Sequence, residues 1–295
     1  MIVCIPAYNE AGHIEKIVRR AKTFSNEVIV CDDGSVDNTG VIAKDAGATV
    51  IRHNTNMGYG ASIITLFDAA KKKNADVVVT LDSDEQHDVN DIPKMLDPIL
   101  KQEADIVIGS RFLTKKDSQK IPKYRKFGIK TITKLTQMVS HSNITDSQSG
   151  FRAYNKNALE KLDLYEKGMS ISTEILFRIK EKNLQIKEVP ITIRYDVENA
   201  STHHPLKHGI SVINSILQFI TLRHPLTFYG LPGIGFLIIG IFFMSSALDL
   251  FSASRYVSTP TILVSLGCVI VGMILLATSV ILYTIIALLR GKINN

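Results

Sequence analysis

Short apolar runs alternate with helical patterns along the first 111 residues. The runs expected to be strands cover residues 2–7, 27–33, 49–54, 76–82 and 105–111. The segments between them, expected to be helices, cover residues 11–24, 38–47, 58–74 and 92–102. This alternation is typical of βαβ units. It predicts an α/β domain whose mostly parallel sheet is covered by helices on both faces.

The pattern changes in the last quarter of the chain, where two long apolar segments follow one another. Residues 226–248 and 260–289 contain no charged side chain. Each is longer than the roughly 18 to 20 residues that a membrane-spanning helix needs. Two buried helices of a soluble domain would ordinarily each show a polar face. We therefore expect a C-terminal two-helix transmembrane hairpin over residues 226–295, with spans at about 226–248 and 262–289.

The charges that flank these spans predict their orientation. Four cations lie outside the pair: Lys207, Arg223, Arg290 and Lys292. The segment that connects the spans carries only Arg255 against Asp249. Cytoplasmic flanks are enriched in Lys and Arg, so both ends of the hairpin should face the cytoplasm. The expected location is the cell membrane, with two spans and a cytoplasmic catalytic domain.

Two basic, partly amphipathic segments stand apart from both patterns. They cover residues 124–140 and 206–224, and either could lie in the plane of the lipid headgroups as an interfacial helix. An ordinary surface helix is an equally good interpretation of the first segment. The expected division is residues 1–204 for the α/β domain, 205–225 for an interfacial helix and 226–295 for the hairpin.

Composition narrows the classes of partner. The formal net charge is +6, from 34 Lys and Arg against 28 Asp and Glu. No recognition helix, zinc-ligand spacing or basic aromatic strand accompanies it, so we expect no nucleic-acid partner. The expected partners of this excess positive charge are anionic lipids and phosphorylated ligands. The three cysteines lie in apolar runs without metal-ligand spacing and are expected to be core residues.

Polar clusters follow three of the expected strands. They read PAYNE at 6–10, CDDGSVDNT at 31–39 and LDSDEQHD at 81–88. Ligands of parallel sheets bind beyond the carboxyl ends of the strands, so the clusters should meet at one edge. The chain has neither G-x-G-x-x-G after the first strand nor G-x-x-x-x-G-K-[ST], which argues against a dinucleotide cofactor and a P-loop.

The third cluster has three interpretations. Asp82, Asp84 and Gln86 alternate along the chain, and oxygen ligands of this kind suit Mg²⁺ or Mn²⁺. The cluster could instead be a solvated helix start capped by Asp88 or Asn90. A phosphoacceptor pocket of the receiver-domain kind would need a lysine after the fifth strand, where the chain reads GSR at 109–111.

Taken together, the motifs resemble those of family 2 glycosyltransferases, which have the GT-A fold. The motifs are PAYNE (6–10), DDGSVDNT (32–39), NMGYGAS (56–62), LDSDEQH (81–87), GSR (109–111), TDSQSGFRA (145–153) and VPITIRYD (189–196). Within that family the chain is most similar to dolichyl-phosphate hexose synthases, and its tail resembles archaeal members. The resemblance covers roughly residues 2–225.

The resemblance implies a membrane-anchored, inverting hexosyltransferase. Its donor would be a nucleotide-diphosphate sugar, with a UDP-hexose favoured and GDP-mannose possible. Its acceptor would be dolichyl or polyprenyl phosphate, and the lipid-linked product would serve protein or cell-surface glycosylation. Two alternatives remain open: a family 2 enzyme with a polysaccharide or glycolipid acceptor, and a non-catalytic, membrane-tethered nucleotide-sensing module. A processive synthase is disfavoured because the chain has no tryptophan for a Q-x-x-R-W motif.

The resemblance also implies roles for particular residues. The nucleoside pocket would be lined by Pro6, Tyr8, Glu10 and Asp33, with Asp32 close by. Asp82, Asp84 and Gln86 would hold Mg²⁺ or Mn²⁺ at the donor diphosphate. Arg194 would close over that diphosphate. The acceptor side would comprise Arg111, Arg125, Asp146, Gln148 and Arg152, and the catalytic set would be Asp84, Asp146, Arg111 and Arg152.

Two points qualify these roles. A lipid phosphate is already ionised at neutral pH and needs little general-base help, so Asp146 is expected to orient the acceptor or the sugar. Many relatives have a lysine in the motif Asn-x-Gly-Lys-Gly, where this chain has Tyr59. A contact that the lysine would make with the diphosphate must then come from another residue.

Overall fold

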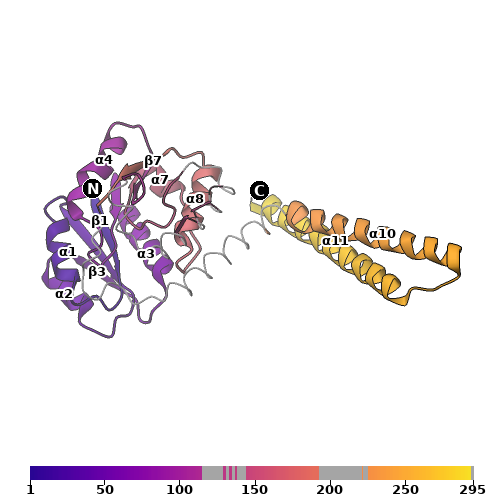
Figure 1. Ribbon diagram of the computed structural model, residues 1–295. Coiled ribbons are helices and arrows are strands. Elements are labelled where there is room, and N and C mark those ends of the chain that lie inside the picture. The colour runs from indigo at the N-terminus through magenta and orange to yellow at the C-terminus, as the bar shows by residue number, and fades with distance from the viewer. Residues whose placement is uncertain are drawn as a thin grey trace. The chain divides into compact units, whose positions relative to one another are not determined.

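The computed structural model describes residues 1–114, 129–130, 133–134, 137, 144–192, 221 and 225–293 (Figure 1). The chain divides into two compact units, Met1–Ser215 and Ile216–Asn295. Arg125, Arg194 and most of the two basic segments lie outside the described residues. The domain boundaries predicted near residues 204 and 225 depend on those segments and stay predictions.

The first unit contains a seven-stranded sheet in the order β3-β2-β1-β4-β6-β5-β7. The five strands expected from the sequence are present: β1 Ile2–Ala7, β2 Glu27–Asp32, β3 Thr49–Arg52, β4 Val77–Thr80 and β5 Ile106–Ser110. Two further strands, β6 Arg152–Asn155 and β7 Ile186–Pro190, complete the sheet. β6 lies between β4 and β5 and is antiparallel to both, whereas the other pairs are parallel. The predicted mostly parallel α/β architecture is confirmed.

Helices cover both faces of this sheet (Figure 1). They are α1 Ile14–Ala21, α2 Thr39–Asp45, α3 Tyr59–Lys72, α4 Ile92–Leu100, α7 Lys156–Lys161 and α8 Ile171–Glu181, with a 3₁₀ turn, η1 Val89–Asp91. Successive strand residues point to opposite faces. In β1, Val3 and Ile5 therefore pack in the core with α1, α2 and α4, while Ile2 and Cys4 pack in the core with α3, α7 and α8.

Strand registers bring the polar clusters to one edge. Ala7 is paired with Asp32 at the ends of β1 and β2, and the N–H of Asp33 donates to the Ala7 carbonyl at 2.9 Å. β4 is aligned on the other side of β1, where the N–H of Leu81 donates to the Cys4 carbonyl at 3.0 Å. The segments that follow these three parallel strands therefore leave the sheet at its carboxyl edge, as predicted.

The second unit is a helical hairpin. A short π-helical turn, η2 Leu226–Gly230, leads into α10 Leu231–Ser254, and α11 covers Thr259–Ile293. Segments Leu226–Ser254 and Thr259–Ile286 are long and apolar enough to cross a membrane, with mean hydropathies of 2.1 and 2.6. Most of their large apolar side chains, such as Ile238, Phe242 and Ile274, are exposed. Such surfaces fit a lipid environment.

Small residues line the contact between the two helices. They recur every seven positions, at Gly233, Gly240 and Ala247 on α10 and at Ser265, Gly272 and Ser279 on α11. The Ser265 hydroxyl donates to the Gly240 carbonyl at 2.8 Å, and a Cβ added to Gly272 would lie 2.9 Å from the Gly233 carbonyl oxygen. Helices in membranes associate through such close backbone contacts and interhelical hydrogen bonds.

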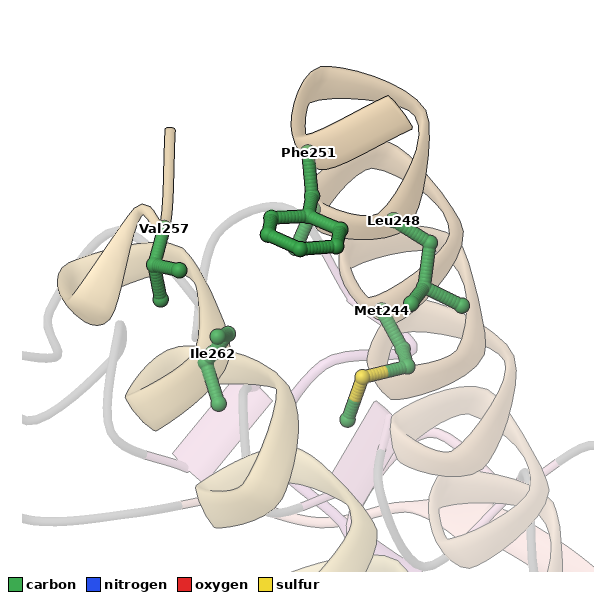
Figure 2. A pocket seen from close by; sticks show the side chains of 6 residues that line it. Met244, Leu248, Phe251, Val257 and Ile262 are labelled. Atoms are coloured by element: carbon green, nitrogen blue, oxygen red, sulfur yellow. The ribbon is translucent and has the colours of Figure 1, made fainter. Parts of the chain in front are cut away.

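Near the connection between the helices, the hairpin has a hollow with apolar walls (Figure 2). Its walls are formed by Met244, Ala247, Leu248, Phe251, Val257 and Ile262. None of these side chains carries a group that could bind a phosphate or a sugar. The polar clusters that the sequence singles out lie in the first unit.

We predict that Gly240→Leu disrupts the hairpin. A Cβ at this position would lie 2.7 Å from a Val269 methyl group and 3.1 Å from the Ser265 carbonyl oxygen, so the helices must separate. Overpacking of this kind costs about 1–3 kcal/mol. Thermal unfolding of the full chain in detergent, followed by circular dichroism, should show a lower midpoint. Gly235→Leu is the matched control because a Cβ there meets nothing within 4 Å; equal midpoints for both variants would contradict the packing argument.

Candidate active site

Asp82 lies at the centre of the carboxyl edge, and both of its carboxylate oxygens are hydrogen-bonded. The Tyr59 hydroxyl donates to Oδ1 at 3.1 Å, and Nε2 of His87 lies 3.2 Å from Oδ2. Gly150 presses against the carboxylate, because a Cβ added to this glycine would lie 2.4 Å from either oxygen. The Asp82 side chain is still 28% exposed. It is therefore held in one orientation while remaining accessible to a ligand.

The start of α3, which places Tyr59, is fixed by a neighbouring loop. A Cβ on Gly58 or on Gly60 would lie 2.5 or 2.2 Å from carbonyl oxygens of residues 166–168, so the two backbones are in close contact. The Ala61 N–H donates to the Lys167 carbonyl at 3.1 Å. The carboxylate of Glu174 accepts hydrogen bonds from the backbone N–H groups at 165 and 166. Glu174 thus supports the loop that fixes α3.

A tight turn carries the other two residues predicted to bind metal. Asp84 accepts a hydrogen bond from the N–H of Gln86 at 3.0 Å, and Glu85 between them has a φ of +55°. The Glu85 carboxylate contacts Nδ1 of His13 at 3.3 Å and the Lys16 ammonium. These contacts attach the turn that carries Asp84 and Gln86 to the segment at residues 13–16, which includes the start of α1.

The carboxylates of this edge repel one another. Burial, followed by the charges of Asp84, Asp37 and Asp82, raises the pKa of Glu10 to about 7. Burial also opposes the ionisation of Asp82, but the hydrogen bond and the charge of the His87 ring, followed by the hydrogen bond from Tyr59 and the charge of Arg111, keep its pKa below the ordinary value. No group of three His, Cys, Asp or Glu side chains with metal-binding geometry occurs among the described residues.

The donor set nevertheless fits Mg²⁺ or Mn²⁺. These ions are often held by one or two carboxylates, with water and phosphate oxygens at the other positions. Asp82 and Asp84 supply two carboxylates, Gln86 supplies an amide oxygen, and a bound cation would offset the carboxylate repulsion that contributes to the raised pKa of Glu10. The ligand set itself stays a prediction.

Glu10 predicts how stability changes with pH. The pKa of Glu10 is higher in the folded state than in the unfolded state. Its contribution to the free energy of unfolding is therefore fully present below about pH 4.5 and is lost as the pH rises through about 7. Glu10→Gln removes this loss. In EDTA, we expect the variant to unfold at a higher temperature than the wild type at pH 8 and at nearly the same temperature at pH 5. A higher unfolding temperature for the wild type than for Glu10→Gln at pH 8 would contradict the charge repulsion at Glu10.

The residues predicted to line the nucleoside pocket lie beside this edge. Pro6 is buried in β1, and Tyr8 is 38% exposed just after it. Oδ1 of Asp32 accepts the N–H of Ser35 at 2.9 Å, whereas its buried Oδ2 makes no hydrogen bond within the described part of the chain and lies 3.5 Å from the Arg52 guanidinium. That oxygen retains acceptor capacity.

Asp33 has a structural task that the sequence does not reveal. Its carboxylate contacts Nδ1 of His53 at 2.6 Å and accepts the N–H groups of Met57 and Gly58 at 2.9 and 2.8 Å. His53 in turn bonds to Thr65 on α3 at 2.9 Å. Asp33 therefore holds the loop that leads to Tyr59, and its contact with the nucleoside stays a prediction.

A buried ion pair forms the predicted acceptor side. Arg111 donates to Asp146 through Nε at 2.6 Å and through a terminal nitrogen at 2.7 Å, and its backbone N–H donates at 3.2 Å. Asp146 is fully buried. Burial opposes its ionisation, but the Arg111 guanidinium outweighs this effect and lowers the pKa of Asp146. Arg111 is only 6% exposed, so the pair is not a surface salt bridge.

Arg152 and Gln148 support the same loop. Arg152 is 2% exposed, and its guanidinium donates to the backbone carbonyls of Ser147, Ser149 and Ser172 at 2.9, 2.9 and 3.3 Å. The N–H of Gln148 donates to Asp146 at 3.3 Å. These contacts give Arg152 a structural role. The contacts of Arg111, Asp146, Gln148 and Arg152 with the acceptor stay predictions.

Glu188 on β7 was not among the residues expected from the sequence. It accepts the N–H and hydroxyl of Thr145 at 2.8 and 2.9 Å and the N–H of Asp146 at 2.9 Å. His87 and His53 were also missed as site residues. His87 could be noticed only as a member of the LDSDEQH motif, and His53 carries no motif signal.

Comparisons with known proteins find similar sequences and a similar fold. The model of "Glycosyl transferase family 2" matches residues 2–163. A UDP-N-acetylglucosamine–dolichyl-phosphate N-acetylglucosaminyltransferase of Methanococcus voltae is 33% identical over 74% of this chain and 92% of its own. A dolichyl-phosphate hexose transferase of Haloferax volcanii is 29% identical over 74% of this chain and 92% of its own.

Among solved structures, glucosyl-3-phosphoglycerate synthase from Mycobacterium tuberculosis, in complex with Mn²⁺, UDP and glucosyl-3-phosphoglycerate, has the same fold. The TM-score is 0.55 and the identity is 21%, and the match covers 74% of this chain and 78% of the other. The match confirms the fold class predicted from the sequence, and the family match confirms the resemblance drawn from the motifs.

Proposed function

Because the chain belongs to glycosyltransferase family 2, we propose that it transfers a hexose from a nucleotide-diphosphate sugar to the phosphate of dolichol or another polyprenol. The observation that carries this proposal is the carboxyl edge itself. There, Asp82 is held by two hydrogen bonds beside Asp84 and Glu10, whose charges repel one another. The relatives named as dolichyl-phosphate transferases support the acceptor.

Asp82, Asp84 and Gln86 would hold Mg²⁺ or Mn²⁺, which stabilises the charge that develops on the departing diphosphate. Pro6, Tyr8, Glu10, Asp32 and Asp33 would bind the nucleoside. We favour a UDP-hexose, in line with the named donor of the Methanococcus voltae relative. GDP-mannose remains a testable alternative.

The acceptor phosphate supplies the nucleophile. One of its oxygens attacks the anomeric carbon while the bond from that carbon to the diphosphate breaks, which inverts the configuration. No proton has to be removed, because the phosphate is already ionised. Arg111 would place its guanidinium beside the acceptor phosphate. Because Arg111 is paired with Asp146, the pair carries no net charge. Arg152 would hold the loop that carries Asp146 in position.

The hairpin would anchor the enzyme in the membrane that contains the acceptor. Its two apolar helices are long enough to cross the bilayer. From the flanking charges, we propose that the catalytic domain faces the cytoplasm. The lipid-linked sugar would then serve glycosylation of proteins or of the cell surface.

The test is transfer of radiolabel from UDP-glucose, UDP-N-acetylglucosamine and GDP-mannose to dolichyl phosphate by membranes containing the full chain, with Mn²⁺ or with EDTA. We expect a product soluble in organic solvent from one donor, and its loss in EDTA. Donor hydrolysis or binding without a lipid product would overturn the acceptor assignment. Membranes without the protein provide the background.

A further inference from the structure

We propose that Tyr59 and His87 are positioning residues that clamp Asp82 for binding of the metal–nucleotide complex. This inference rests on the proposed function and extends it to residues outside the predicted site. The two side chains approach the carboxylate from different elements. Tyr59 is the first residue of α3, and His87 lies in the segment between β4 and η1.

Each clamp residue occupies one oxygen of the same carboxylate. The Tyr59 hydroxyl donates to Oδ1 at 3.1 Å, and the His87 ring faces Oδ2 with Nε2 at 3.2 Å. A carboxylate oxygen can accept two hydrogen bonds, so each oxygen keeps a lone pair for a ligand. Gly150 lies against a further side of the carboxylate, because a Cβ added to this glycine would come within 2.4 Å of either oxygen. The clamp therefore fixes the direction in which the remaining lone pairs point.

The His87 ring is placed by packing. It is 7% exposed and stacks at a tilt on Phe151, with the ring centroids 5.5 Å apart. Its Nδ1 is buried without a hydrogen-bond partner in the described part of the chain. Nε2 is therefore the ring nitrogen that contacts a polar group there, and with a proton on Nε2 the ring donates to Asp82.

Tyr59 occupies the position at which many relatives have a lysine, and it makes a different kind of contact. A lysine at this position could reach toward a diphosphate with its charge. Here, the hydroxyl instead donates to the carboxylate, and the α3 start that carries it is fixed by Asp33 and by the Lys167 carbonyl. We infer that this residue acts through Asp82 and has no direct contact with the donor.

The experiment measures Mn²⁺ binding and transfer separately. Free Mn²⁺ is quantified by electron paramagnetic resonance with the full chain in detergent, in the presence of UDP and, in parallel, of GDP. Residues that orient a metal ligand typically contribute 10- to 100-fold in affinity or activity. We expect Tyr59→Phe and His87→Leu each to weaken Mn²⁺–nucleotide binding by about tenfold or more. We also expect both variants to lower kcat.

Conservative and control variants separate the clamp from a general loss of structure. His87→Gln keeps an N–H donor and should bind more tightly than His87→Leu. Tyr59→Lys should bind the Mn²⁺–nucleotide complex more weakly than the wild type. Tyr165→Phe is the matched control, because Tyr165 is 71% exposed and its ring lies under Arg178. It should match the wild type in binding and transfer.

Failure of the clamp and failure of the proposed function are distinguishable. Wild-type affinity and kcat in both Tyr59→Phe and His87→Leu would overturn the clamp while transfer by the wild type still supports the function. Weakened Mn²⁺ binding in these variants would support the clamp even if the wild type transfers nothing to dolichyl phosphate. A wild type that does not bind Mn²⁺ with either nucleotide would overturn the clamp.

Discussion

Asp84→Ala is expected to lower transfer to the lipid acceptor by at least about 1,000-fold while leaving the fold intact. Stabilisation of a leaving diphosphate by a divalent cation is worth several kcal/mol, and each 1.4 kcal/mol of barrier is about tenfold in rate. Asp84 accepts a hydrogen bond from the N–H of Gln86 within the turn that carries the predicted ligands. Initial rates with the donor that the wild type uses, together with circular dichroism, test this prediction.

The matched control for Asp84 is an acid outside the site. Asp97 on α4 is exposed and pairs with Lys101 at 2.8 Å. Asp97→Ala should leave the rate within about twofold of the wild type, because exposed ion pairs contribute little. If Asp84→Ala also kept the wild-type rate, the metal role of the turn would be excluded.

Arg111→Met is expected to destabilise the catalytic domain by about 3–5 kcal/mol. The substitution leaves the Asp146 carboxylate, which is fully buried, without the guanidinium that balances its charge. The double variant Arg111→Met/Asp146→Asn removes both charges and should recover part of this loss. Neither variant should transfer sugar at a detectable rate. Denaturant unfolding of the full chain in detergent measures the stability.

A surface ion pair between β7 and the segment that precedes β5 provides the comparison. Lys187 on β7 contacts Glu103 at 2.9 Å, and both side chains are about half exposed. Lys187→Met should change the stability by at most about 1 kcal/mol. Equal losses of unfolding free energy for Arg111→Met and Lys187→Met would show that the buried pair contributes no more to stability than the surface pair. If Arg111→Met/Asp146→Asn were as unstable as Arg111→Met, an unbalanced buried charge would be excluded as the cause of the loss.

The active edge could be predicted only in part. Asp82, Asp84 and Gln86 stand out because an acidic run directly follows an apolar strand, a pattern that is local in the sequence. Tyr59 lies 23 positions from Asp82, and nothing in the local pattern connects them. Likewise, the resemblance implies an acceptor role for Arg152, but no local pattern reveals that its guanidinium donates to three backbone carbonyls.

The sequence by itself determined the five alternating strands, the edge where the polar clusters meet and the two apolar spans. The strands and the spans each depend on the periodicity or length of one hydrophobic segment, which is a local property. The common edge follows because ligand-binding segments of a parallel sheet lie at the carboxyl ends of its strands. Only the tertiary structure decided that β6 enters the sheet antiparallel, that Arg111 pairs with Asp146 across 35 positions, and that small residues of α10 face those of α11. These features depend on the register between distant segments, which is set by the packing of the whole domain or hairpin.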